Sequence, residues 1–129
     1  MIVLDASAVI EVLLGTHRAG AIEDRLRAGR TCAPHVIDIE VAHVVRRLCL
    51  RGELTAERGL TALAQLADLG IIRYAHVLLL PRIWELRDNL TAFDAAYVAL
   101  AEVLAAPLVT TDARLATAPG HAATIELIA

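Results

Sequence analysis

Three aspartates stand at boundaries between the secondary-structure elements that the sequence predicts, and one glutamate lies inside a predicted helix. They are Asp5, Glu40, Asp94 and Asp112. Carboxylate oxygens, together with water, are the ligands that hard divalent cations such as Mg²⁺ prefer. A fold that brings these four side chains together would therefore create a site for one or two metal ions.

The predicted sheet places two of these acids. Asp5 lies between an apolar run that predicts a buried strand and a run whose apolar residues have helical spacing. Asp112 follows a second predicted strand. In an open α/β sheet, ligands bind at the carboxyl ends of the strands, so we expect Asp5 and Asp112 at the same edge. Spacing alone does not place Asp94 or Glu40 there.

The elements that would position the acids alternate between strands and helices. Strands are predicted at residues 1–4, 30–33, 71–77, 107–110 and 123–128, and helices at 6–14, 17–29, 36–50, 56–69, 81–89, 92–104 and 113–116. This alternation argues for a parallel sheet of about five strands with helices on both faces, a three-layer α/β/α fold. A chain of 129 residues is expected to form one domain, residues 1–129, with one core.

Composition indicates which residue types build the core and where in the cell the protein is expected. Hydrophobic residues make up 57% of the chain and aromatic residues 3%, so Leu, Val, Ile and Ala must build the core. No window of about 18 residues lacks both charge and proline, which argues against a membrane span. Met1 leads into the first strand without a basic region, so we expect a cytoplasmic protein. Cys32 and Cys49 fit reduced thiols better than a disulfide or a metal site.

The charged residues exclude several kinds of site. All twelve basic residues are Arg, and the chain has no Lys. A P-loop, a Schiff base and Lys-dependent phosphate sites are therefore excluded. The net charge of −3 leaves no general basic surface, so any RNA contact must come from local Arg groups or from a metal. Arg46 and Arg47 fit a solvated helix face at least as well as a phosphate contact, and the five His residues lack metal-ligand spacing.

Each of the four acids also has a purely structural interpretation. Asp94 stands three residues after Thr91, as in a capping box with Asp in place of Glu, and taken alone this role is favoured. Asp112 could stabilise the start of a short helix through the helix dipole. Glu40 could pair with a neighbouring His or Arg on a solvated face, and Asp5 could be a turn residue at a strand end. Singly, none of the four indicates a function.

Three stretches that contain the aspartates resemble the PIN-domain ribonucleases, and specifically the VapC toxins of bacterial toxin–antitoxin pairs. They are residues 2–8 (IVLDASA), 89–101 (NLTAFDAAYVALA) and 110–115 (TTDARL). The resemblance extends over nearly the whole chain in length and in the order of elements. The three motifs together are a specific signal, whereas any one of them alone would be weak.

The resemblance implies an acidic pocket at the carboxyl edge of the sheet, in which the four acids are metal ligands and catalytic residues. It also implies supporting residues, which are Ser7 beside the first acid, Asn89 before the capping threonine, and Thr110 or Thr111 beside the last acid. Some relatives have a further acid just after the position of Asp112. This chain has Ala113, Arg114 and Leu115 there, so the resemblance supports a second metal ion less firmly than the first.

The activity that the resemblance implies is a metal-dependent endoribonuclease toxin that uses Mg²⁺, or Mn²⁺ as a substitute. One ion would lower the pKa of a bound water and align it for in-line attack on a phosphodiester, and a second would stabilise the leaving oxygen. The resemblance further implies RNA products with a 5′ phosphate and a 3′ hydroxyl, a homodimer, and a cognate antitoxin that occupies the groove.

Two alternatives differ from this interpretation. An aspartate-phosphorylated or phosphatase fold also begins with a strand and an Asp. It is disfavoured because Ser7, rather than an acid, stands two residues after Asp5, and because its Lys is missing. A non-cleaving RNA-binding or antitoxin-interaction domain would keep the acids only for metal or partner binding. The sequence does not separate this second alternative from a nuclease.

Overall fold

The chain folds around a five-stranded sheet with the strand order β3-β2-β1-β4-β5. The computed structural model describes all residues from Met1 to Ala129. The strands are β1 (Ile2–Leu4), β2 (Thr31–Pro34), β3 (Ile72–Tyr74), β4 (Leu108–Thr110) and β5 (Ile125–Leu127). The helices are α1 (Ala6–Leu14), α2 (Ala19–Arg27), α3 (Ile37–Leu50), α4 (Ala56–Asp68), the 3₁₀ helix η1 (His76–Leu79), α5 (Leu80–Glu85), α6 (Ala92–Leu104) and α7 (Ala113–Thr117).

The strands pair in parallel throughout, which confirms the predicted sheet. Val3 of β1 is paired with Cys32 on one side and with Leu108 on the other. Every residue of β1, β2 and β4 is buried, because helices cover both faces of the sheet. Parallel strands covered on both faces favour continuous apolar runs, which explains the apolar sequences of β1 and β4.

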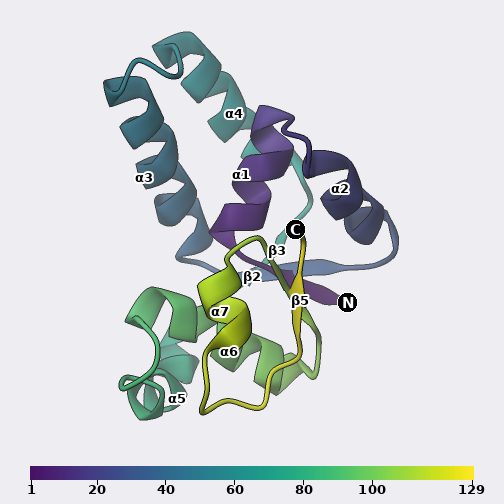
Figure 1. The fold of residues 1–129 in the computed structure, drawn as a ribbon, viewed down its shortest axis with the longest axis vertical. Coiled ribbons are helices and arrows are strands. Elements are labelled where there is room, and N and C mark those ends of the chain that lie inside the picture. Colours follow the sequence, from purple (N-terminus) through teal and green to yellow (C-terminus); the bar gives the residue numbers. More distant parts are fainter.

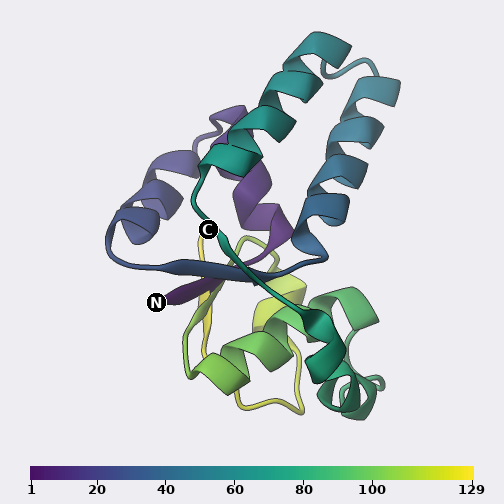
Figure 2. The same ribbon diagram turned by 180° about the vertical axis from the view of Figure 1, so that it is seen from behind.

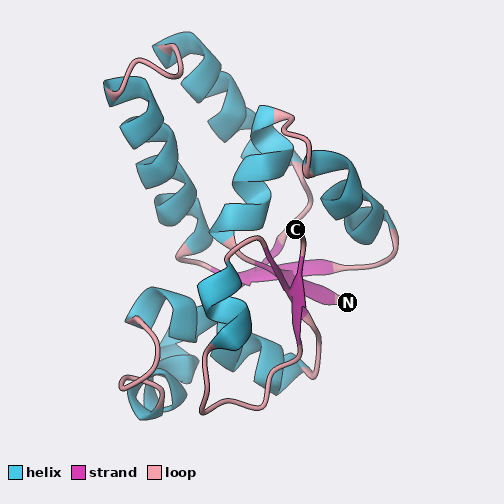
Figure 3. Ribbon diagram, in the orientation of Figure 1, coloured by secondary structure: helices cyan, strands magenta, loops and turns pink.

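Helices form a layer on each side of the sheet, which confirms the predicted three-layer α/β/α fold. Figures 1 and 3 show α1 and α2 on one side of the strands and α6 on the other. Helices α3 and α4 form an antiparallel hairpin that extends away from the sheet on the side of α1 (Figure 2). No helix combines the length and the apolar character that crossing a bilayer requires.

The core is almost entirely aliphatic, as the composition predicts. It is one cluster of 28 buried residues, in which Tyr97 is the only aromatic side chain. Helix α6 is buried at every position from Ala95 to Ala101, because it packs against the middle of the sheet. A helix that is apolar all round is typical of such a central position.

The predicted strand at residues 71–77 is wrong at its carboxyl end. Only residues 72–74 are in β3, and the chain continues into η1 and α5. The last pair between β2 and β3 joins Pro34 to Tyr74, and His35 N–H donates to Tyr74 O just beyond it. Because β2 ends at Pro34, no partner strand remains for residues after Tyr74. Helix α5 also ends earlier than predicted, at Glu85.

Candidate active site

The Asp5 carboxylate is held in place by hydrogen bonds at the end of β1. Asp5 is the N-cap of α1, and its Oδ1 accepts from Ala8 N at 3.0 Å and from Ser7 Oγ at 2.7 Å. Its Oδ2 accepts from Thr110 Oγ1 at 2.5 Å. Asp5 is only 6% exposed, and burial raises its pKa more than these hydrogen bonds lower it.

Hydroxyl groups connect the ends of β1 and β4. Thr110 Oγ1 accepts from Asp112 N at 3.0 Å, and Ser7 Oγ accepts from Thr111 N at 3.1 Å. The structure thus places Ser7 and Thr110 as hydrogen-bond donors to Asp5. Thr111 contributes its backbone N–H to this network. The predicted neighbourhood of Asp5 and Asp112 is therefore observed.

Glu40 lies in the first turn of α3 and carries a buried carboxylate oxygen without a partner. Its Oε1 and the hydroxyl of Tyr97 on α6 are buried neighbours, but their geometry forms no hydrogen bond, and neither atom has another partner. Burial raises the pKa of Glu40, and the charges of Asp94 and Asp5 raise it further, whereas the nearby Tyr97 hydroxyl lowers it. Glu40 forms no ion pair, so pairing on a solvated face does not account for it.

Asp94 is the third residue of α6, and its backbone rather than its carboxylate serves the helix cap. Thr91 is the N-cap and its Oγ1 accepts from Asp94 N at 3.1 Å. Burial raises the pKa of the Asp94 carboxyl more than the Thr91 hydroxyl lowers it, and the charge of Asp112 raises it further. The predicted capping role of Thr91 and a chemical role for the Asp94 carboxylate are therefore compatible.

Asp112 combines a capping role with an exposed ion pair. It is the N-cap of α7 and its Oδ1 accepts from Arg114 N at 2.9 Å. The Arg114 guanidinium lies 3.5 Å from the same carboxylate, with a side chain that is 92% exposed. Its positive charge lowers the pKa of Asp94. Arg114 thus places a cation directly beside Asp112.

Asn89 lies at the rim of the site without a side-chain hydrogen bond to the acids. It lines a hollow of about 230 Å³ together with Thr91, Asp94, Arg114 and three apolar residues. Its side chain packs against Gly120, where a Cβ atom would lie 2.6 Å from the Asn89 Nδ2. Asn89 therefore shapes the hollow that leads to Asp94 and Arg114.

The four acids lie at one edge of the sheet, where each influences another. The first turns of α1 and α3 lie beside α7 in both ribbon views (Figures 1 and 2). Asp5 and Glu40 each interact with the charge of Asp94, and Asp94 interacts with that of Asp112. No three His, Cys, Asp or Glu side chains are close enough in this arrangement to hold a metal ion. The donor set of carboxylates and the unpaired Glu40 Oε1 nevertheless suit a hard divalent cation.

Tyr97 and Arg114 are two residues of the site that sequence reasoning did not select. Tyr97 stands three residues after Asp94 on α6, so helical geometry puts the two side chains on neighbouring positions of one face. Arg114 stands two residues after Asp112. In the sequence it was named only because it stands where the resemblance implies a further acid. The helical spacing from Asp94 is the signal that could have identified Tyr97.

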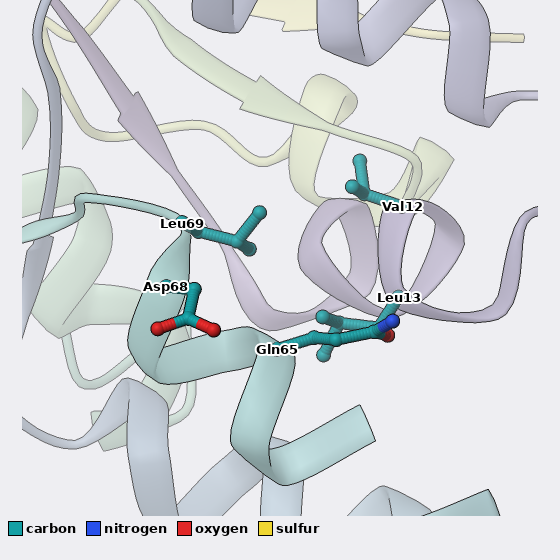
Figure 4. A pocket seen from close by; sticks show the side chains of 5 residues that line it. All are labelled: Val12, Leu13, Gln65, Asp68 and Leu69. Carbon is teal, nitrogen blue, oxygen red and sulfur yellow. The ribbon is translucent and has the colours of Figure 1, made fainter. Parts of the chain in front are cut away.

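A second hollow lies away from these acids and offers no comparable chemistry. It has a volume of about 300 Å³ and lies between the carboxyl-terminal turns of α1 and α4. Figure 4 shows its lining, which is Val12, Leu13, Gln65, Asp68 and Leu69. It contains a single carboxylate and no cation, so we do not assign it a chemical role.

Comparison with known proteins gives matches along nearly the whole chain. Residues 2–120 match the PIN domain family. The chain is 41% identical over 129 residues to ribonuclease VapC12 of Mycobacterium tuberculosis, covering 100% of both chains. It is 47% identical over 115 residues to ribonuclease VapC9 of the same species, covering 89% of this chain and 88% of the relative.

Solved structures show the same fold at low sequence identity. VapBC2 from Rickettsia felis, bound to a DNA fragment from its promoter, superposes with a TM-score of 0.73 at 14% identity and 98% coverage of each chain. Mycobacterium tuberculosis VapC20, a sarcin–ricin loop cleaving toxin, gives a TM-score of 0.68 at 16% identity, with 90% of this chain and 93% of the toxin covered. From the family match and the identity to the curated relatives, the chain belongs to the PIN-domain family, among the VapC ribonucleases.

Proposed function

We propose that this chain is an endoribonuclease toxin that hydrolyses RNA phosphodiester bonds with the help of a divalent cation. The observation that carries the proposal is the buried Oε1 of the half-buried Glu40, which has no hydrogen-bond partner and lies at the sheet edge that also holds Asp5 and Asp94. A buried charge without a partner is strongly unfavourable unless a cation or a protein donor compensates it. The names of the VapC relatives support RNA as the substrate class.

The cation that fits the site is Mg²⁺, with Mn²⁺ as a substitute, in one or two copies. Its ligands would be drawn from Asp5, Glu40, Asp94 and Asp112, which offer only carboxylate oxygens. When bound, it supplies activation of a water molecule and neutralisation of charge on the phosphate. Arg114 adds a positive charge beside Asp112, which favours one cation over two.

Other residues of the site hold the carboxylates in position and can contact the RNA backbone. Ser7, Thr110 and the Ala8 N–H fix both oxygens of Asp5, so this carboxylate has little freedom to rotate. Tyr97 is a buried core residue that lies beside Glu40 on the inner side of the site. Arg114 is largely exposed and only loosely paired, so it can turn towards a phosphate of the bound strand. Arginine suits this contact because its planar donors match phosphate oxygens.

The partners that we propose are a cognate antitoxin protein and a second copy of the chain. Structures of VapBC proteins support an antitoxin as the inhibiting partner. Exposed apolar side chains on η1 and α5, which are those of Val77, Leu78, Leu80 and Trp84, offer a surface for a homodimer. The single hydrophobic cluster supports one domain over residues 1–129. We further propose a cytoplasmic location.

The direct test is cleavage of structured RNA by the purified, antitoxin-free protein in Mg²⁺ or Mn²⁺. We expect cleavage that EDTA stops and that Asp5→Asn removes. Cleavage that survives either control would contradict the carboxylate site. The absence of cleavage on any RNA, combined with retained RNA binding, would instead favour a non-cleaving RNA-binding or antitoxin-interaction domain.

A further inference from the structure

We propose that a hollow next to the acids, between α3 and the start of α6, binds one base and one phosphate of single-stranded RNA. We call it the α3–α6 pocket, and its lining residues are Ile39, Glu40, His43, Val44, Arg47 and Phe93. Its volume of about 430 Å³ lies within the range of small-ligand sites. The inference rests on the proposed nuclease function, because it assigns the pocket to the same substrate.

The pocket adjoins the acidic site. Glu40 belongs to both, and Phe93 directly precedes Asp94 on α6. A nucleotide held in the pocket would therefore be next to the phosphate that the acids face. This position makes the pocket a site for the strand beside the scissile bond rather than a remote surface.

The aromatic ring of Phe93 is available for stacking. Phe93 is the only Phe in the chain, and it is 56% exposed at the second position of α6, where it makes no part of the core cluster. Across the pocket, Ile39 on α3 is 71% exposed. Single-stranded RNA is commonly recognised by unstacked bases that lie on exposed aromatic rings. The two apolar walls therefore fit the faces of one base.

Two cationic or titratable side chains complete the pocket on the face of α3. His43 and Arg47 stand four residues apart, so they are neighbours along one side of the helix. Neither forms an ion pair, although many arginines of this chain do. In a protein with a net charge of −3, an arginine without an acidic partner beside a proposed nuclease site fits a phosphate contact.

The charges favour RNA over a protein segment as the occupant. The pocket offers a cation on one side and the acidic cation site on the other, which suits a phosphate chain that runs between them. An apolar helix of a protein partner would find exposed apolar side chains at Val77, Leu78 and Leu80 instead. The polar and aromatic mixture of the α3–α6 pocket is typical of nucleotide recognition.

The test measures binding of a labelled short single-stranded RNA by fluorescence anisotropy, with Ca²⁺ replacing Mg²⁺ and a gel to check that the strand stays intact. Phe93→Ala should weaken binding by about 5- to 100-fold, as expected from the loss of one stacked base. Phe93→Tyr should bind like the wild type because its ring still stacks. Val103→Ala is the control, since Val103 lies on the same helix α6 and is 69% exposed but lies outside the pocket.

An abasic nucleotide identifies the stacked base. RNA strands that each carry the abasic nucleotide at a different position are compared. At one position the wild type should lose about the same factor in affinity as Phe93→Ala loses with the intact strand. The two losses should not add when they are combined, because both remove the same contact. Independent losses that multiply would overturn the stacking assignment.

Salt dependence tests the phosphate contact separately. Arg47→Ala should make the slope of log K against log salt shallower by about 0.7, the value for one phosphate of a single strand. Arg46→Ala is the control, because Arg46 is its exposed neighbour but does not line the pocket. Equal slopes for the two variants would overturn the assignment of Arg47.

The outcomes separate this inference from the proposed function. If the wild type cleaves RNA while Phe93→Ala binds and cleaves normally, the pocket is not a base site and the nuclease proposal stands. If binding depends on Phe93 but no RNA is cleaved, the nuclease proposal fails and the pocket stands. If Phe93→Ala leaves RNA affinity unchanged but weakens antitoxin binding or self-association, the pocket is a protein interface and the inference is overturned.

Discussion

Two sets of acids in this protein have opposite environments. Three acids away from the site, which we call the framework acids, each hold an arginine with two hydrogen bonds. Glu102 does so with Arg82 at 2.9 Å for both contacts, and Glu126 with Arg25 at 2.7 and 2.9 Å. Asp38 holds Arg73 in the same way, at 2.8 and 2.7 Å. Asp5, Glu40 and Asp94 have no such partner, although the chain contains twelve basic residues, all of them Arg.

This difference shows in the direction of the pKa shifts. Hydrogen bonds from Arg82 lower the pKa of Glu102, whereas burial raises the pKa of Glu40. The framework acids are compensated by arginine, whereas these three acids are not, and they lie at one edge of the sheet. Carboxyl groups whose pKa values are raised by burial and by one another cluster at functional sites. The contrast therefore supports a site that is built to receive a cation from outside the chain.

The largest expected effect is on activity, from replacing an acid of the site. Asp94→Asn should lower RNA cleavage by more than about 100-fold, the upper range for loss of a residue that only supports a metal ligand. The metal-free variant should be as stable as the wild type or more stable, because like charges at the site repel one another. Cleavage assays and thermal unfolding in EDTA check the two parts.

The exposed Asp24 provides the control for that experiment. Asp24→Asn removes the same charge from a surface pair with Arg27 and should leave cleavage unchanged. A large drop in the melting temperature of Asp94→Asn, with cleavage retained, would show that Asp94 serves the helix cap and not the chemistry.

Breaking an ion pair of a framework acid should lower stability and leave RNA cleavage unchanged. Glu102→Gln should lower the free energy of unfolding by about 1 to 2 kcal/mol, because it weakens charge-assisted hydrogen bonds to Arg82 and to Ala122 N. RNA cleavage per folded molecule should not change. Denaturant unfolding and a cleavage assay on the same samples check both parts. Lost activity without lost stability would contradict a purely structural role for Glu102.

Neutralising an unpaired acid should stabilise the protein modestly. Glu40→Gln should raise the free energy of unfolding in EDTA by up to about 1 kcal/mol at neutral pH, because a partly buried charge without a partner is removed. Denaturant unfolding in EDTA measures the change. A clear loss of stability would mean that Glu40 already has a compensating partner within the chain.

The smallest effect is on the acid limb of the stability curve. Because the folded pKa of Glu102 is lowered, its contribution is complete above its unfolded pKa of about 4.3 and is lost as the pH falls through the folded value. Wild-type stability should therefore fall more steeply than that of Glu102→Gln below about pH 4.3. Denaturant unfolding of both proteins at a series of acidic pH values measures this difference. If the free energies of unfolding of the wild type and Glu102→Gln fell in parallel, the prediction would be wrong.

The fold was predictable where local signals set the limits of an element. Helix α6 begins after the Thr91 cap and runs over the predicted residues because its cap and its apolar run are both local. The strand predicted at residues 71–77 failed because its length depends on a distant partner, the end of β2 at Pro34. Sequence pattern contains the apolar run but not the point at which the neighbouring strand ends.

The site was predictable in part for the same reason. Strand ends placed Asp5 and Asp112, and the hydroxyls of Ser7 and Thr110 connect them in the structure. The charges of Glu40 and Asp94 interact because α3 and α6 both begin at the same sheet edge, which no local spacing encodes. Tyr97 was missed because its apolar neighbours on α6 give it the appearance of an ordinary core residue.

The most direct test of the central claim is a titration of the metal-free protein with Mn²⁺, followed by the electron paramagnetic resonance signal of the free ion. We expect the wild type to bind one or two ions per chain, Glu102→Gln to bind the same number, and Asp94→Asn to lose binding or bind much more weakly. Equal Mn²⁺ binding by the wild type and Asp94→Asn, or no binding by the wild type, would contradict a cation site formed by the unpaired acids.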